Sequence, residues 1–278
     1  MHPDDIDDIE LDLLLEGVYR RWGYDFRDYS RATLRRRIKQ HAQHLGLQTP
    51  GQLIAPALRD VEAFHALLQT FSVNVTEMFR DPPFYLSLRK NVIPLLRTFP
   101  YIKVWHAGCA SGEEVMSTAI LLHEEGLYDR ATIYATDIND TALERAKEGI
   151  YPLEVFKNFA ANYQAAGGKG SLMDYIHADD THAIVDRRLT KNVTFALHNL
   201  AVDGVFSEMH LVICRNVLIY FNRQLQDRAI GLFHESLVNG GILALGSKET
   251  LHFSRLAPQF KALDDKWKIY RKHHGHAH

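Results

Sequence analysis

Short apolar runs alternate with helical segments from residue 102 onward, and this alternation constrains the fold more strongly than any other feature of the chain. Five runs are typical of buried strands and lie at residues 102–107, 131–136, 193–197, 211–214 and 242–245. Helices are predicted over residues 113–126, 141–149 and 224–238. Strands that alternate with helices build a parallel sheet that is covered on both faces. The sequence therefore predicts an α/β fold, closed by a hairpin at residues 260–263 and 268–270.

The first 71 residues carry only helical periodicity, so we expect an N-terminal helical domain over residues 1–71. Apolar residues recur at helical spacing at Ile6, Ile9, Leu13 and Val18. Gly23 marks the end of that helix. Ser30 is a suitable N-cap for a second helix that reaches Gly46. Further helices are predicted near residues 51–55 and over residues 61–71.

The rest of the chain is predicted to form a connector and one large domain. Residues 72–97 are interpreted as a connector and a linking helix, with Asp81 as N-cap and Pro82 in the first turn. Residues 98–278 then form the α/β domain. Residues 152–190 break its alternation, so they are interpreted as a small antiparallel β-subdomain insertion. Strand-like pieces in this insertion lie at residues 172–176 and 183–185.

Composition argues against several classes of function. The formal net charge of −2 disfavours binding of the whole protein to nucleic acid or to an anionic membrane. The two cysteines form no CxxC pair, so neither a zinc site nor a disulfide framework is expected. The acidic start does not resemble a signal peptide, and no apolar run reaches the roughly 20 residues that span a bilayer. We therefore expect a cytoplasmic protein without direct membrane insertion. The histidines in residues 273–278 could chelate a metal, but an unstructured tail is the favoured interpretation.

A glycine-containing turn follows the first predicted strand. It reads Ala-Gly-Cys-Ala-Ser-Gly at residues 107–112, between a strand and a helix, where nucleotide-like ligands bind in α/β sheets. The pattern is not G-x-G-x-x-G, which disfavours a dinucleotide. Asp137 ends the next strand, where a carboxylate can accept both ribose hydroxyls; its alternative role is a helix N-cap or turn residue. Together these features favour an adenosine-containing cofactor and leave NAD, FAD and S-adenosylmethionine open.

Five longer blocks are more specific. They read N-V-T-E-M-F-R-D at residues 74–81, W-H-A-G-C-A-S-G-E-E at 105–114, A-T-D-I-N at 135–139, G-I-Y at 149–151 and C-R-N-V-L-I-Y-F at 214–221. In content and order they resemble the CheR family of chemotaxis receptor methyltransferases, over about residues 10–272. Near the last strand this chain departs from the family's G-x-S-E, because Lys248 precedes Glu249. The resemblance implies a Rossmann-like class I methyltransferase sheet with an N-terminal all-helical domain and a β-subdomain, using S-adenosyl-L-methionine and releasing S-adenosyl-L-homocysteine.

The resemblance also implies roles for individual residues. Those expected to bind the cofactor are Asn74, Thr76, Arg80, Ala107, Gly108, Glu113, Asp137, Asn199, Leu200, Arg215 and Asn216. Structural alternatives exist for three positions: Asn199 could cap a turn, Arg215 could pair with an acidic neighbour, and Tyr220 could belong to the core.

The expected reaction is methyl transfer to glutamate side chains of a receptor. A glutamate carboxylate, with a usual pKa of about 4.3, is ionised near neutral pH and needs no general base. The enzyme must align oxygen, methyl carbon and sulfur and exclude water. Arg80 is predicted to orient the incoming carboxylate through paired donors, with Tyr220 as a wall or a hydrogen-bond donor. The alternative for Arg80 is contact with the cofactor's own carboxylate.

A basic helix is the predicted docking surface for the cytoplasmic domain of methyl-accepting chemoreceptors. Its cations are Arg31, Arg35, Arg36, Arg37 and Lys39. A basic helix face is more often simply solvated, but the family's N-terminal helices resemble a docking surface for acidic receptor helices. The insertion at residues 152–190 is a second candidate, since some family members grip a receptor C-terminal peptide there. Two alternative functions stay open: the same chemistry on another signalling protein, and a non-catalytic module that binds the cofactor or its product.

Overall fold

The structure is a computed structural model that describes residues 3–71, 76–206 and 208–273. The chain divides into two compact units. The first, here called the helical unit, contains Met1–Asn74 and Leu218–Ala229. The second, called the sheet unit, contains Val75–Val217 and Ile230–His278. Each unit is therefore assembled from two separate stretches of sequence.

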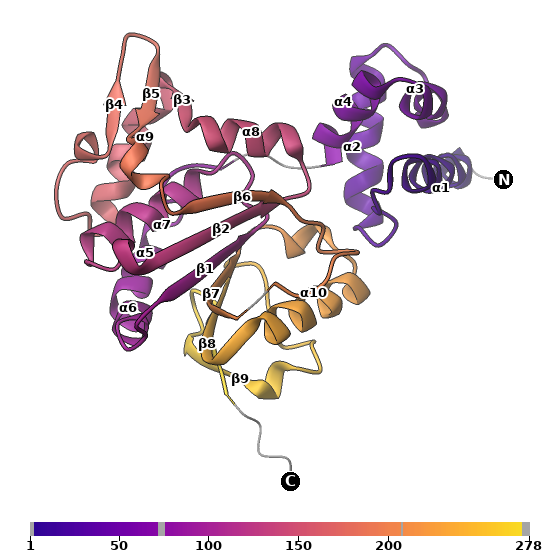
Figure 1. Ribbon diagram of the computed structural model, residues 1–278. Coiled ribbons are helices and arrows are strands. Elements are labelled where there is room, and N and C mark those ends of the chain that lie inside the picture. The colour runs from indigo at the N-terminus through magenta and orange to yellow at the C-terminus, as the bar shows by residue number, and fades with distance from the viewer. Residues whose placement is uncertain (1–2, 72–75, 207, 274–278) are drawn as a thin grey trace. The chain divides into compact units, whose positions relative to one another are not determined.

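A seven-stranded sheet forms the centre of the sheet unit (Figure 1). Its strands are β1 (Ile102–Ala107), β2 (Ala131–Asp137), β6 (Val193–Leu197), β7 (Met209–Cys214), β8 (Leu237–Leu245), β9 (Phe260–Asp264) and β10 (Ile269–Lys272). Their order is β6-β2-β1-β7-β8-β10-β9. The first five are parallel, whereas β10 and β9 are antiparallel and close the sheet as a hairpin. The predicted α/β fold and closing hairpin are confirmed.

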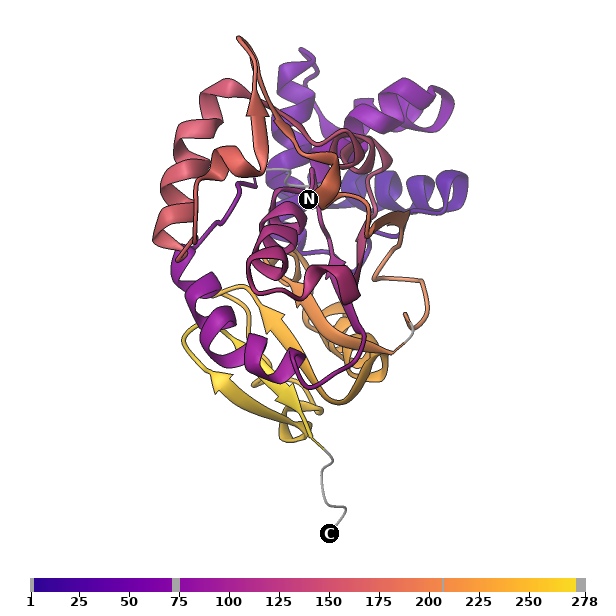
Figure 2. The ribbon, with the colours of Figure 1, turned by 60° about the vertical axis from the view of Figure 1, so that its left-hand side comes forward.

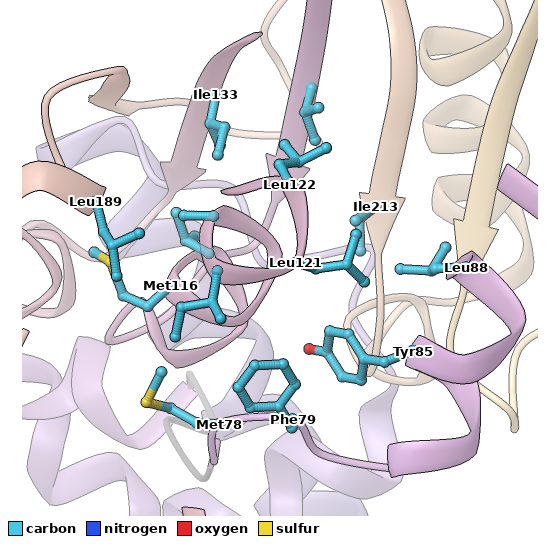
Figure 3. Packing of buried hydrophobic residues seen from close by; sticks show 14 of the residues in the cluster. Met78, Phe79, Tyr85, Leu88, Met116, Leu121, Leu122, Ile133, Leu189 and Ile213 are labelled. Atoms are coloured by element: carbon cyan, nitrogen blue, oxygen red, sulfur yellow. The ribbon is translucent and has the colours of Figure 1, made fainter. Parts of the chain in front are cut away.

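One face of this sheet packs against helices α5 (Pro82–Ser87), α6 (Ile93–Leu96) and α7 (Glu113–Glu124). A π-helical turn, Leu88–Val92, joins α5 to α6, where a single regular helix was predicted. Figure 3 shows Phe79 and Tyr85 of this cluster near Leu121 and Ile213. Met78 is fully buried there and fills apolar space, as its unbranched and adaptable side chain allows.

The opposite face of the sheet is also covered. Trp105 of β1 stacks on Phe206 at 5.0 Å between ring centroids and meets Phe233 of α10 (Arg223–Ser236) edge-on at 5.5 Å. Apolar side chains on both faces explain why the strands read as continuous hydrophobic runs rather than alternating ones. Helix α8 (Asp140–Glu148) follows β2 along the chain.

The insertion forms a second, three-stranded antiparallel sheet in the order β3-β5-β4, whose first strand begins two residues before the predicted bound at residue 152. These strands are β3 (Ile150–Pro152), β5 (His182–Val185) and β4 (Ile176–Ala178). The predicted strand at residues 172–176 is largely wrong, because Leu172–Asp174 is a 3-10 turn and the strand begins at Ile176. Helix α9 (Leu153–Ala165) was not predicted, and Figure 2 shows it beside these short strands.

The helical unit contains α1 (Pro3–Trp22), α2 (Arg31–His44), α3 (Ile54–Arg59) and α4 (Val61–Phe71). The apolar spacing correctly predicted a helix over α1, but the helix buries Leu14 and Val18, whereas Ile6, Ile9 and Leu13 are exposed. Ser30 precedes α2 but makes no side-chain cap.

Residues after β7 complete the helical unit. Tyr29 and Phe221 form an antiparallel bridge, and their rings lie 4.9 Å apart. Asn222 donates from its backbone and side chain to Asp28, at 2.8 and 2.9 Å. The segment therefore adds buried apolar surface and hydrogen bonds to the N-terminal helices.

Candidate cofactor site

The turn after β1 needs glycine at two positions. Gly108 and Gly112 have φ of +81° and +89°, the left-handed region that glycine adopts without strain. A Cβ on Gly108 would lie 2.5 Å from Cγ2 of Val217, and one on Gly112 would lie 2.9 Å from Cβ of Ala146. The predicted glycine turn thus brings together the ends of β1 and β7 and the start of α7.

Asp137 fastens this turn to the end of β2. Its Oδ2 accepts from the backbone N–H of Ala110 at 2.8 Å, and its Oδ1 accepts from that of Asn139 at 2.9 Å. Asn139, not Asp137, is the N-cap of α8, since its side chain accepts from Ala142 at 3.2 Å. Burial raises the pKa of Asp137, although the backbone amides oppose that shift.

Glu113 is the first residue of α7 and is also buried. Ser111 donates its hydroxyl to the Glu113 carboxylate at 2.8 Å, and the backbone oxygen of Ser111 accepts from the Tyr151 hydroxyl at 3.1 Å. Burial raises the pKa of Glu113 to about 6. A carboxylate at a helix N-terminus is favoured by the helix dipole, but desolvation dominates here.

Asp137 and Glu113 together suit a cationic adenosine ligand. Among the described residues neither carboxylate has a cationic partner, although both are buried. Burying a carboxylate is costly unless a positive charge or hydrogen-bond donors compensate it. S-adenosylmethionine carries an ammonium, a sulfonium and two ribose hydroxyls. The residues present therefore fit this cofactor.

Arg215 follows β7 and lies in a buried ion network. Its guanidinium donates to Glu114 at 2.7 Å and to Asp81 at 2.6 Å, and it stacks 4.0 Å from the centroid of the Phe84 ring. Burial alone would raise the pKa of Glu114, but Arg215 and the nearby His106 hold it below its usual range. The Arg215 side chain is 1% exposed; its two terminal nitrogens make these contacts, whereas its Nε is buried without a hydrogen-bond partner among the described residues.

Two left-handed residues flank Arg80. Phe79 and Asp81 have φ of +52° and +58°, which costs energy for any residue other than glycine. Phe79 is held by a bond from its backbone N–H to the Ser117 hydroxyl at 2.8 Å, and Asp81 by its pair with Arg215. Asp81 therefore stands at the N-cap position of α5 and Pro82 begins that helix, as predicted, but the Asp81 side chain makes no cap hydrogen bond and pairs with Arg215 instead.

Other predicted cofactor residues lie in several segments. Thr76 is half-buried in the sheet unit, whereas Asn74 lies outside the described residues. Asn199 and the buried Leu200 follow β6. The Asn199 side chain accepts from the backbone N–H of Ala201 at 2.9 Å, so it does cap a turn. Their roles toward the cofactor stay predictions.

Tyr220 belongs to the helical unit. Its ring lies 4.8 Å from the guanidinium carbon of Arg37, and its backbone oxygen accepts from Ser30 at 2.7 Å. Arg37 also donates to the carbonyl of Phe71 at 2.9 Å. Two residues predicted for different roles, receptor docking and catalysis, are therefore in contact with each other.

The basic helix α2 is partly neutralised by α1. Arg31 pairs with Asp12, and Arg35 pairs with Asp8. All four side chains are more than one third exposed, so these ion pairs are weak and open to competition. Among the described residues, the exposed Arg36 and Lys39 have no acidic partner.

Sequence reasoning missed the acidic side chains that support the site, namely Asp81, Glu114 and Glu249. The two consecutive glutamates at the start of α7 were an available signal, since one faces Ser111 and the other faces Arg215. In the part of the chain that the structure describes, no cluster of residues could hold a metal ion. No helix in that part is long and apolar enough to span a bilayer.

Comparison with known proteins gives one consistent family. Residues 74–269 match the family described as CheR methyltransferase, SAM binding domain, and residues 9–72 match the CheR methyltransferase, all-alpha domain. The chain is 52% identical to Cher3 of Pseudomonas putida, over 95% of this chain and 97% of that protein.

More distant relatives carry a functional name. The chemotaxis protein methyltransferase of Listeria monocytogenes is 28% identical over 88% of this chain and 92% of its own length. The protein of the same name from Salmonella typhimurium is 27% identical over 87% and 83%. Among solved structures, the N-methyltransferase NodS of Bradyrhizobium japonicum covers 85% of this chain and 98% of its own, with 13% identity and a TM-score of 0.40, which is too distant to bear on function.

Proposed function

The chain belongs to the CheR methyltransferase family, and we propose that it methylates glutamate side chains on the cytoplasmic helices of bacterial chemoreceptors. The observation that carries this proposal is the pair of buried carboxylates, Asp137 and Glu113, at the carboxyl ends of the parallel strands. Relatives named chemotaxis protein methyltransferase support the receptor as substrate. Such a protein would act in the cytoplasm.

The proposed cofactor contacts divide by chemistry. Asp137 would accept the ribose hydroxyls through the lone pairs that its two backbone amides leave available. Glu113 would attract the positive charge of the methionine part. The bound cofactor supplies an electrophilic methyl group. Gly108 adopts its positive φ without strain and leaves room for the Val217 side chain, which would hold the turn in place beside the ligand.

Arg80 is the proposed orienting residue for the incoming glutamate. The left-handed residues on either side fix the direction in which its backbone presents the side chain. A guanidinium can hold a carboxylate through two donors, and that orientation, rather than proton removal, is what an ionised nucleophile requires. The catalytic role of Tyr220 stays a prediction.

Receptor docking is proposed for the basic helix α2. Arg36 and Lys39 are exposed and have no acidic partner among the described residues, so they offer positive charge directly. Arg31 and Arg35 would become available when an acidic receptor helix replaces Asp8 and Asp12. Arg37 is packed on Tyr220, so a change there would also disturb the helical unit.

A methylation assay tests the proposal. The purified chain is incubated with methyl-labelled S-adenosylmethionine and the cytoplasmic domain of a chemoreceptor from the same cell. We expect base-labile label on receptor glutamates, located by mass spectrometry, and no label when those glutamates are changed to alanine. Label on another signalling protein alone would contradict the receptor assignment. Cofactor binding without label on any protein of the extract would contradict catalysis.

A further inference from the structure

Glu249 is buried just after β8 and gathers backbone amides from two strand ends. Its carboxylate accepts from the N–H of Gly246 at 2.5 Å, of Val217 at 2.9 Å and of Asn216 at 3.2 Å. The residue is 4% exposed. The turn that follows β7 is thereby tied to the loop that follows β8.

The turn held in this way is under backbone strain. Asn216 has φ of +60°, a conformation that asparagine tolerates but does not prefer. A Cβ on Gly246 would lie 2.7 Å from the Glu249 carboxylate and 2.9 Å from the nitrogen of Asn216, so only glycine permits this approach. Three hydrogen bonds to one buried carboxylate can offset the strain.

The turn at residues 215–217 also contacts the glycine turn at residues 107–112. The side chain of Val217 fills the space that a Cβ on Gly108 would take. Next along the chain, Leu218 begins the segment that belongs to the helical unit. Residues 215–217 therefore contact the glycine turn through Val217 and contribute Arg215 to the buried ion network. They also directly precede the second stretch of the helical unit.

We propose that Glu249 is a positioning residue for the cofactor site. It holds residues 215–217 in the left-handed turn that directs Asn216 toward the cofactor, and it acts through this turn without touching the ligand. The proposal rests on the proposed cofactor contact of Asn216. Asp137 is held by the backbone amides of Ala110 and Asn139, whereas Glu249 binds those of residues 216, 217 and 246, so the contacts of Asp137 should stay in place when Glu249 is changed.

The test is a double-mutant cycle between Glu249 and Asn216. Calorimetry measures the affinity of each variant for S-adenosylhomocysteine at a temperature well below its melting temperature. Glu249→Gln keeps the size but replaces one acceptor oxygen with a donor that faces the amides. We expect roughly tenfold weaker binding in Glu249→Gln and in Asn216→Ala, and no further loss in the double variant, because the two changes remove one shared contact. Ile269→Ala, in the core of β10, is the control for general destabilisation and should bind within about twofold of the wild type.

Each outcome has a distinct meaning. If the wild type itself does not bind S-adenosylhomocysteine, the cofactor assignment fails. If Asn216→Ala binds normally, the contact of Asn216 fails, and with it the proposal for Glu249. Normal binding by Glu249→Gln, additive losses in the cycle, or equal loss in Ile269→Ala would overturn the positioning role. Should Glu249→Gln not fold, Glu249→Asp, which withdraws the carboxylate by one methylene, replaces it in the same cycle.

Discussion

Arg215 donates to Asp81 across 134 residues of sequence and thereby fixes the left-handed residue that precedes helix α5. The same guanidinium reaches Glu114 at the start of α7. One cation thus joins three segments: the end of β7, the connector that carries Arg80, and the first turn after the cofactor loop. The network has both a stabilising and a positioning consequence, because Arg80 lies directly beside Asp81.

Removing this cation should destabilise the fold. Arg215→Ala would leave the partly buried Glu114 without its main counter-charge, and breaking a buried pair costs about 3–5 kcal/mol. Urea unfolding followed by circular dichroism measures the change. Arg188→Ala, which removes an exposed partner of Asp186, is the matched control and should change the midpoint far less. A midpoint unchanged in Arg215→Ala would mean that the network contributes no net stability.

Asp137 should govern cofactor affinity. Asp137→Asn keeps one acceptor oxygen and the side-chain volume but removes the charge and one acceptor. We expect binding of S-adenosylmethionine to weaken by about 1–3 kcal/mol, with the fold intact by circular dichroism. Asp186→Asn, in the β-subdomain, removes a carboxylate with the same kind of backbone contact and should bind normally. Equal affinities would leave Asp137 with only its role in the turn.

Glu113 should make cofactor binding pH-dependent. Burial raises its pKa to about 6, and a cationic ligand favours the ionised carboxylate, so affinity should fall as the pH drops below about 6. Below that pH, the wild-type affinity should fall by up to about tenfold per pH unit. Glu113→Gln should bind the cofactor more weakly, and its affinity should change much less with pH. Titration calorimetry in buffers between about pH 5 and 8 gives both curves.

The raised pKa of Glu113 also makes the free energy of unfolding depend on pH. A raised carboxyl pKa means that the folded protein holds the proton more tightly than the unfolded chain does. Glu113 therefore contributes stability to the folded protein below the usual pKa of a glutamate, and that contribution disappears as the pH rises through its raised pKa of about 6. In the calorimetric series, a wild-type affinity for S-adenosylmethionine that stays constant between about pH 5 and 8 would contradict the binding role of Glu113. It would show that another group meets the positive charge of the ligand.

Receptor docking should respond to the free cations of α2. Arg36→Glu with Lys39→Glu should lower receptor methylation strongly at low salt, with an unchanged affinity for S-adenosylhomocysteine. Charges at a docking rim act mainly on encounter and are screened by salt, so the wild-type rate should also fall as salt rises. Arg255→Glu with Lys261→Glu makes the same change of net charge on the exposed surface of the sheet unit. An equal loss in both variants would point to net charge rather than to α2.

The acidic residues of α1 should act in the opposite direction. Asp8→Asn with Asp12→Asn releases Arg31 and Arg35 from their partners, so the KM for receptor should decrease at low salt. Asp7→Asn with Glu62→Gln changes the net charge equally, removes no ion pair of α2 among the described residues, and should leave the KM nearly unchanged. A KM that rises in the first variant would indicate that these pairs shape the docking surface instead of covering it.

The sequence predicted the sheet well because its strands are apolar on both faces and each ends in a recognisable turn. It did not predict α9, because this helix buries its apolar side chains against segments distant in sequence, as Tyr163 does against Phe79. It placed Asp81 correctly at the N-cap position of α5 but did not predict that its side chain pairs with Arg215, because that contact lies far along the chain. The apolar spacing of Ile6 and Leu13 correctly predicted a helix, but it did not predict which face is buried, because that depends on how the other helices pack against it.

Residues 218–229 complete the core of the helical unit, although they begin inside the sequence block 214–221 that also carries Arg215 and Asn216. A fragment that stops near residue 71 would therefore lack the partners of Tyr29 and Asp28 and would not be an independent folding unit. The same division governs recombination between related methyltransferases. A chimera intended to exchange receptor preference must carry two distant gene segments together, because the helices that would select a receptor are stabilised by a piece encoded about 150 codons downstream.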